Sequence, residues 1–153
     1  MVLNSEALNE SLKNEIMKMK IRNDQPLIFI IDDDEAFTKL LKKELFKANY
    51  TNLKVFQTGN ECLENILEMP DIVFLDYTLE PDMDGLFVLK KIKEVNKGIY
   101  VIMFTAMEKI ELAIDSLKMG AYDFVVKNEH SFMKINNRIK KIINEKQLYE
   151  ISR

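Results

Sequence analysis

The sequence predicts a doubly wound α/β fold in which helices cover both faces of a five-stranded parallel sheet. Short apolar runs alternate with longer segments of helical periodicity, and loops of a few residues join them. Most runs are apolar throughout rather than at every second residue, which is typical of strands covered on both faces. With 153 residues and 47% hydrophobic side chains, the chain is long enough for one such domain.

Five runs rich in apolar, β-branched and aromatic residues are the predicted strands. Four of them are continuously apolar and are expected to be buried on both faces, whereas the run at 53–56 alternates and suits a less buried strand. The predicted strands are residues 27–31, 53–56, 72–75, 99–104 and 122–126.

The segments between and after these runs place their apolar residues on one helical face. In the first segment, Phe37, Leu41 and Leu45 recur at intervals of four. Three of the segments are followed by a residue that ends helices, namely Pro70, Gly98 and Gly120. The predicted helices are residues 34–49, 60–68, 85–95 and 108–119, and a last helix that begins near residue 130.

We expect a main domain at residues 26–145 with a short extension on each side. Residues 1–25 form an N-terminal extension that fits an amphipathic helix. A frayed leader or a helix packed on its own domain is favoured over a helix that binds a partner. The helix pattern rests on four apolar residues that share one helical face: Leu8, Leu12, Ile16 and Met19. Residues 146–153 extend the last helix beyond the length that the sheet needs.

Composition favours a cytoplasmic protein. The net charge of −3 points neither to nucleic acid nor to a membrane, and the basic residues of 134–153 are typical of a solvated helix face. The single cysteine, Cys62, excludes an internal disulfide and fits a packed residue in a reducing compartment. No run is long enough to cross a membrane, and the amino end lacks the pattern of a secretory signal.

Ionisable or polar side chains follow four of the predicted strands. The triplet Asp32-Asp33-Asp34 follows the first strand, Asp76 the third, Thr105 the fourth and Lys127 the fifth. Open α/β sheets bind ligands beyond the carboxyl ends of their strands, so these side chains are expected in one site.

These residue types suit phosphoryl transfer to a carboxylate. Asp76 can attack phosphorus and form an acyl phosphate. Asp32, Asp33 and Asp76 offer the hard oxygen ligands that Mg2+ prefers, and the cation offsets their repulsion. Lys127 and Thr105 can bind phosphoryl oxygens, while the small Ala106 leaves room for the group to enter.

Each residue taken alone has an ordinary structural explanation. One aspartate of the triplet can cap the following helix, Lys127 can be a surface lysine, and Thr105 can be a strand-end hydroxyl. Their joint occurrence, each at the end of a strand, favours the site.

Four stretches resemble the receiver domain of two-component response regulators, and the resemblance covers residues 26–145. They are IIDDDEAF, DIVFLDYTLEPDMDGLFVL, VIMFTAM and AYDFVVKN. The resemblance implies a flavodoxin-like strand order of 2-1-3-4-5. It also implies that the protein is a switch that takes a phosphoryl group autocatalytically and loses it by self-dephosphorylation, and is not otherwise an enzyme.

The resemblance assigns roles to single residues. It implies that Asp76 is the phosphoacceptor and that Phe124 is the switch aromatic, which turns inward when Thr105 is drawn to the phosphate. Thr78 and Met107 flank the site and would tune hydrolysis of the phosphoryl group. The implied Mg2+ ligands are Asp32, Asp33, Asp76 and the backbone carbonyl of Thr78, and the implied phosphoryl ligands are Thr105 and Lys127.

The resemblance also implies partners. The phosphoryl group would come from a sensor histidine kinase or a histidine phosphotransfer protein. Phosphorylation would change the surface of the fourth helix, fifth strand and fifth helix, which would act on a downstream protein or on an output domain absent from this chain. A homodimer through that surface or through the terminal helices is a further arrangement that the resemblance leaves open.

The sequence departs from the family pattern at two places. Gly85 lies nine residues after Asp76, where the family usually has eight. Asn128 follows Lys127 where the family commonly has a proline with a cis peptide bond, so a trans bond is expected here.

Two other classes of function remain open from the sequence. A metal-dependent phosphohydrolase with an aspartyl nucleophile needs the spacing that Asp32-x-Asp34 has, although a cap domain and a second acidic loop are missing. The other class is a pseudo-receiver, an interaction module that is not phosphorylated.

Overall fold

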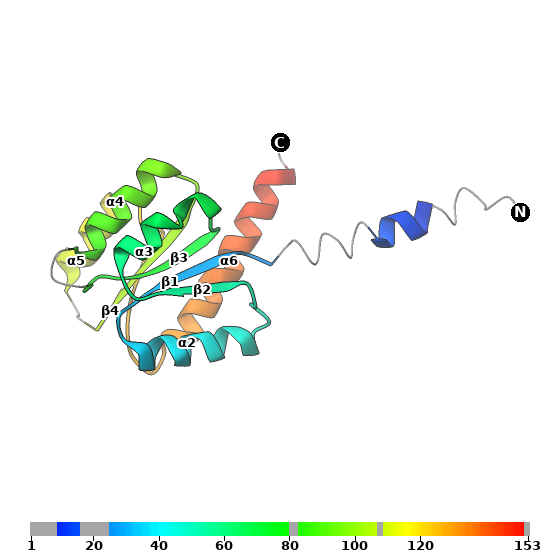
Figure 1. Ribbon diagram of the computed structural model, residues 1–153. Coiled ribbons are helices and arrows are strands. Elements are labelled where there is room, and N and C mark those ends of the chain that lie inside the picture. The colour runs from blue at the N-terminus through cyan, green and yellow to red at the C-terminus, as the bar shows by residue number, and fades with distance from the viewer. Residues whose placement is uncertain (1–8, 16–24, 80–82, 107–108, 152–153) are drawn as a thin grey trace, which may run out of the picture.

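A computed structural model, which describes residues 9–15, 25–79, 83–106 and 109–151, contains the predicted five-stranded parallel sheet (Figure 1). The strand order β2-β1-β3-β4-β5 confirms the predicted order, and every neighbouring pair is parallel. The strands are β1 (Ile28–Ile31), β2 (Leu53–Phe56), β3 (Ile72–Asp76), β4 (Tyr100–Thr105) and β5 (Asp123–Val126).

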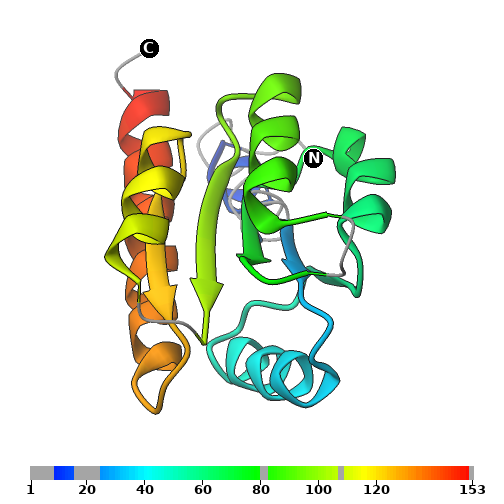
Figure 2. The same cartoon turned by 90° about the vertical axis from the view of Figure 1, so that its left-hand side faces the viewer.

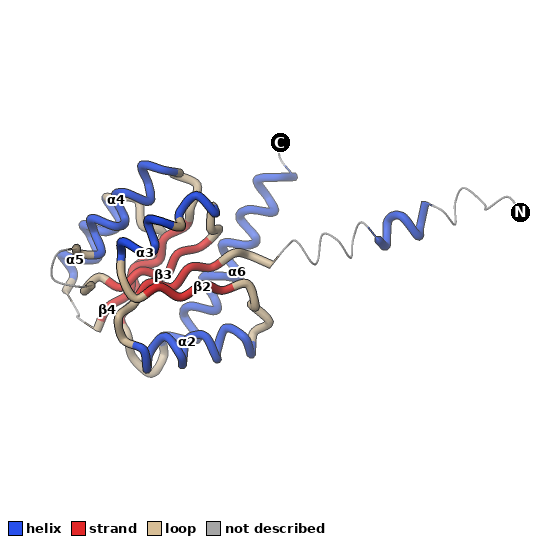
Figure 3. Tube along the Cα trace, viewed as in Figure 1, coloured by secondary structure: helices blue, strands red, loops and turns tan. Residues whose placement is uncertain are grey.

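Helices cover both faces of the sheet, as the tube in Figure 3 shows. Side chains of α2 and α6 share one apolar cluster with one face of the strands, and side chains of α3 and α4 share a second cluster with the other face. Figure 2 shows α6, coloured orange to red, running beside β5. The helices are α2 (Glu35–Lys47), α3 (Gly59–Glu64), η1 (Ile66–Glu68), α4 (Gly85–Val95), α5 (Ile110–Lys118) and α6 (Ser131–Ile151).

The burial of the strands follows their apolar pattern. All residues of β1 and β3 are buried, whereas β2, the strand predicted to be less buried, lies at the edge and is partly exposed. Cys62 is fully buried in the cluster under α3 and α4, and burial raises the pKa of its thiol to about 12. It is therefore a packed residue, as predicted.

The predicted helix at 60–68 is wrong in detail, because two shorter helices occupy this segment. The Thr58 hydroxyl accepts the Glu61 N–H and starts α3 one residue earlier than expected. Asn65 then ends α3 and precedes the tighter η1, and its side-chain amide donates to the Glu61 carbonyl. This side-chain bond competes with the helical pattern.

The two ends of the chain are described to different extents. Residues 9–15 are helical and Leu12 is half exposed, but Leu8, Ile16 and Met19 of the predicted apolar face lie outside the described residues. α6 passes position 145 without a break and exposes Leu148 and Ile151 near its end.

Gly85 is required where α4 approaches β3. Its N–H donates to the Tyr77 carbonyl at 2.9 Å, and a Cβ built on Gly85 would lie 2.6 Å from the Asp76 carbonyl oxygen. Gly85, although it lies nine residues after Asp76, therefore still packs against the Asp76 backbone.

We expect Gly85→Ala to lower the free energy of unfolding by about 1–3 kcal/mol, because the methyl group overlaps backbone atoms that cannot move aside. Urea denaturation measures the change. Gly98→Ala is the matched control, since its Cβ would meet only the side chain of Asn96 at 3.1 Å, and it should change stability by less than about 0.5 kcal/mol. Equal effects of the two substitutions would contradict the close approach.

Candidate functional site

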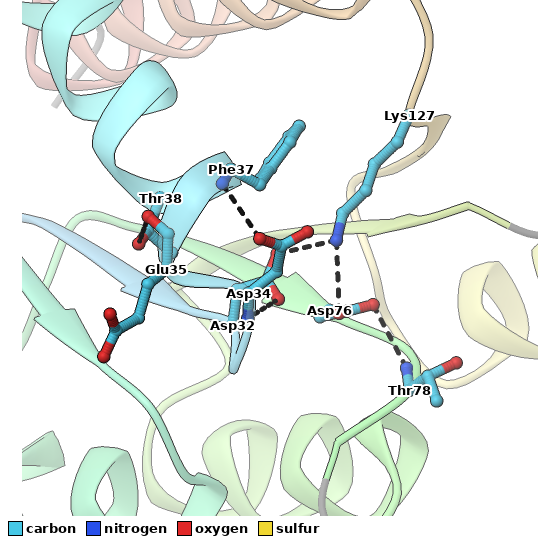
Figure 4. Close-up of polar contacts among 8 residues, drawn as sticks. All are labelled: Asp32, Asp34, Glu35, Phe37, Thr38, Asp76, Thr78 and Lys127. Carbon is cyan, nitrogen blue, oxygen red and sulfur yellow. Dashed lines mark hydrogen bonds and ion pairs between the residues drawn. The ribbon is translucent and has the colours of Figure 1, made fainter.

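The side chains predicted to form a site lie at the carboxyl edge of the sheet. Asp32 directly follows β1, Asp76 ends β3, Thr105 ends β4 and Lys127 directly follows β5. Figure 4 shows Asp32, Asp76 and Lys127 pointing toward one another. The parallel strands bring these residues together because their carboxyl ends share one edge.

Three carboxylates form a group that could hold a metal ion. Ligand oxygens of Asp32, Asp33 and Asp76 all lie within 4.8 Å of one another. Asp32 and Asp76 are 1% and 5% exposed, and Asp33 is exposed. A set of hard anionic oxygens with one open side fits Mg2+, which binds few carboxylates directly and retains water.

Lys127 connects the two buried carboxylates. Its Nζ lies 2.7 Å from Asp32 Oδ2 and 3.3 Å from Asp76 Oδ2. The lysine side chain is 14% exposed, so these ion pairs are largely shielded from water. The ammonium therefore offsets part of the repulsion between the two carboxylates.

Backbone N–H groups orient the carboxylates. The Asp34 N–H donates to Asp32 Oδ1 at 2.9 Å, and the Thr78 N–H donates to Asp76 Oδ1 at 3.1 Å. Asp34 has a separate role, because its own Oδ1 accepts the Phe37 N–H and caps α2. Asp32 and Asp33 thus belong to the three-carboxylate group, whereas Asp34 caps α2.

The surroundings of the site raise the pKa values of Asp76 and Lys127. Burial, followed by the charge and hydrogen bonding of Asp32, raises the pKa of Asp76 from 3.8 to about 7, against the opposing effects of Lys127 and the Thr78 N–H. Burial alone would lower the pKa of Lys127, but its hydrogen bond to Asp32 and the nearby charges raise it overall. Lys127 stays charged, and Asp76 is partly protonated near neutral pH unless a bound cation lowers its pKa.

The raised pKa of Asp76 predicts that metal-free protein loses stability as pH rises from about 4 to about 7. In this range the folded state holds a proton that the unfolded chain has released, so the free energy of unfolding falls with rising pH. Asp76→Asn removes this contribution and should be about 1–3 kcal/mol more stable than the native chain at pH 8 without Mg2+. Urea denaturation at several pH values checks this, and parallel pH profiles for both proteins would contradict it.

The remaining predicted residues differ in how far the structure describes them. Thr105 is buried and Ala106 is exposed beside it, while Met107 lies outside the described residues. Phe124 is partly buried and packs against the apolar cluster under α3 and α4. Thr78 is exposed, and its carbonyl as a metal ligand stays a prediction.

The sequence pattern places Phe37 only in the apolar stripe of α2. In the structure its ring centroid also lies 4.5 Å from Lys127 Nζ, and the Phe104 centroid lies at 5.1 Å. The available signal was its position three residues after the capping Asp34, in the first turn of the helix that starts at the site.

The peptide bond after Lys127 agrees with the expectation from Asn128. No cis peptide bond occurs in the described part of the chain, so this bond is trans. The Asn128 N–H donates to Ser131 Oγ, and Ser131 Oγ donates to the Val126 carbonyl, which holds the turn between β5 and α6.

The fold and the site together define an α/β receiver-type domain, and comparison with known proteins agrees. Residues 28–148 match the model of the response regulator receiver domain. The chain belongs to this family.

The similar proteins include single receivers and longer regulators. Chemotaxis protein CheY of Bacillus subtilis is 36% identical over 100 residues, which are 64% of this chain and 82% of that protein. Transcriptional regulatory protein ZraR of Escherichia coli is 35% identical over 101 residues, which are 65% of this chain and only 22% of ZraR. A chain in the crystal structure of the CheX-CheY-BeF3-Mg+2 complex from Borrelia burgdorferi is 33% identical with a TM-score of 0.66, and the match covers 75% of this chain and 87% of that one.

Family membership gives the general function. Receiver domains of two-component systems are phosphorylation-dependent switches that bind Mg2+ at an acidic cluster, and this chain has such a cluster. Among the described residues, no helix is both long and apolar enough to span a membrane.

Proposed function

We propose that this chain accepts a phosphoryl group on Asp76 from the phosphohistidine of a sensor histidine kinase or a histidine phosphotransfer protein. Mg2+ would be held by Asp32, Asp33, Asp76 and the backbone carbonyl of Thr78. The observation that carries the proposal is the meeting of Asp32, Asp33, Asp76 and Lys127 at one edge of the sheet.

The transfer itself asks the protein mainly for positioning and charge compensation. An Asp76 oxygen bonds to phosphorus as the phosphorus–nitrogen bond of the donor histidine breaks, and the imidazole leaves. Bound Mg2+ supplies positive charge to the carboxylates and to the incoming phosphoryl oxygens. Lys127 contacts Asp76 Oδ2 at rest and can move to a phosphoryl oxygen, while the Thr78 N–H keeps Asp76 Oδ1 oriented.

Phosphorylation would be transmitted through Thr105 and Phe124 to the surface of α5, β5 and α6. Thr105 offers its hydroxyl to the phosphoryl group, and Phe124 lies two positions before the end of the adjacent β5. The α5 helix exposes Ile110, Ile114 and Leu117, which recur at helical spacing. An exposed apolar stripe suits binding to another protein.

The proposed partners would bind the surface of α5, β5 and α6. We propose a cytoplasmic location and a downstream protein or output domain that responds to the changed surface. ZraR is several times longer than the matched segment, so a receiver domain can be part of a longer chain. A homodimer through α5, β5 and α6 or through the terminal helices is a further form of this proposal, with α6 contributing its exposed end.

Intact-mass measurement after incubation with acetyl phosphate and Mg2+ tests the proposal. The native chain should gain one phosphoryl group, and a native chain that gains none would be a pseudo-receiver. Asp34→Asn should also be labelled, because asparagine caps helices as well as aspartate does. Loss of labelling in Asp34→Asn, together with turnover of a small phosphate ester by the native chain, would instead support the phosphohydrolase.

A further inference from the structure

The ammonium of Lys127 has aromatic neighbours as well as carboxylates. Its Nζ lies 4.5 Å from the ring centroid of Phe37 and 5.1 Å from that of Phe104. The same atom lies 2.7 Å from Asp32 and 3.3 Å from Asp76. A cation within about 6 Å of a ring centroid is attracted by the electrons of the ring face. The ammonium is therefore held by two rings and two carboxylates.

The orientation of the Phe37 ring is restricted by its surroundings. It stacks on Phe132 of α6 with centroids 5.9 Å apart and an interplanar angle of 20°, and it lies 5.1 Å from the Phe104 ring. The backbone N–H of Phe37 donates to Asp34, and the Asp34 N–H donates to Asp32. Figure 4 shows Phe37 and Lys127 on neighbouring segments beside the carboxylates.

We propose that Phe37 is a positioning residue that holds the Lys127 ammonium between Asp32 and Asp76. Lysine has a flexible four-carbon stem, and a ring face beside the ammonium limits the directions that it can take. The consequence for phosphoryl transfer rests on the proposed function: a lysine already held beside Asp76 needs only a short movement to meet the incoming phosphoryl group.

Phe37 differs from the second ring in where it is anchored. Phe104 is fully buried within β4 and belongs to the core. Phe37 is partly buried on the first turn of α2, directly after the segment that contains Asp32. Phe37 thereby connects the segment after β1, which contains Asp32, with Lys127 after β5.

A double-mutant cycle in metal-free protein tests whether the ring holds the lysine. The unfolding equilibria of the native chain, Phe37→Leu, Lys127→Met and the double variant are measured in urea. We expect the two substitutions to be coupled by about threefold to tenfold in the unfolding equilibrium constant. Leucine keeps most of the apolar volume, so Phe37→Leu should still fold, and additive effects would overturn the proposal.

Labelling by acetyl phosphate tests the consequence for the reaction. Phe37→Leu should lower the maximal labelling rate by about threefold to tenfold, while Phe37→Tyr, which keeps the ring face, should retain it. In the Lys127→Met background, Phe37→Leu should slow labelling no further. A slower double variant, or no rescue by tyrosine, would overturn the positioning role.

Phe132→Leu is the matched control, because it removes a ring from the same stack but not one that the structure places over Lys127. It should slow labelling less than Phe37→Leu does, because the Phe37 ring stays beside Lys127 and loses only one of its packing partners. Slowing equal to that of Phe37→Leu would attribute the effect to packing and overturn the proposal. If the native chain is not labelled at all, the proposed function fails, and the unfolding cycle alone decides whether Phe37 holds Lys127.

Discussion

Asp76→Asn should gain no phosphoryl group from acetyl phosphate and Mg2+, under conditions in which the native chain gains one. The amide has no anionic oxygen to attack phosphorus, although it fills the same buried place at the end of β3. Intact-mass measurement detects the difference directly. A variant that is still labelled would move the nucleophile to another residue.

Asp33→Asn distinguishes the role of a metal ligand, Asp33, from the role of the nucleophile, Asp76. Asp33 is the exposed member of the three-carboxylate group, so its loss should weaken Mg2+ binding and leave Asp76 able to react. Labelling should therefore be slower at low Mg2+ and recover as Mg2+ is raised, whereas Asp76→Asn should stay unlabelled at every concentration. Recovery of Asp76→Asn, or none for Asp33→Asn, would contradict these roles.

Lys127→Met should lower the free energy of unfolding by about 2–4 kcal/mol at pH 8 without Mg2+. Methionine replaces the stem but leaves Asp32 and Asp76 buried beside each other without the ammonium that both contact. Added Mg2+ should restore much of the loss, because the cation takes over the compensation of charge. Urea denaturation with and without Mg2+ measures both effects.

Lys47→Met is the control for Lys127→Met. Lys47 also contacts a carboxylate, Glu44, at 3.2 Å, but its side chain is 62% exposed. Water screens such a pair, so this substitution should change stability by less than about 0.5 kcal/mol and be insensitive to Mg2+. A loss of similar size in both variants would show that burial of the Lys127 pair contributes little.

The strands of the sheet followed from patterns within short segments, whereas their order was implied by the resemblance to receiver domains. Continuous apolar runs predicted buried strands, and the alternating run at 53–56 predicted a less buried strand, because burial on one or two faces determines which residues a strand tolerates. The apolar pattern does not predict the division of the segment 60–68, because the hydrogen bond from Asn65 to the Glu61 carbonyl depends on local geometry that this pattern does not reflect.

The site was predictable in outline for a topological reason. Residues that end parallel strands share one edge, so the sequence places Asp76 and Lys127 near the Asp32 triplet. The sequence does not determine which aspartate caps α2, because Asp32, Asp33 and Asp34 are chemically the same. In the folded chain Asp34 caps α2 and Asp32 contacts Lys127.

The sequence by itself determined the α/β class and the chemical character of the sheet edge, because periodicity and strand-end charges are local properties, and its resemblance to receiver domains implied the strand order. The tertiary structure decided which side chains contact one another at that edge and how their pKa values shift. It pairs Lys127 with an aspartate 95 residues away, raises the pKa of Asp76 by burial, and sets Phe37 against the ammonium. These depend on distances between segments remote in the chain, which only packing of the whole domain establishes.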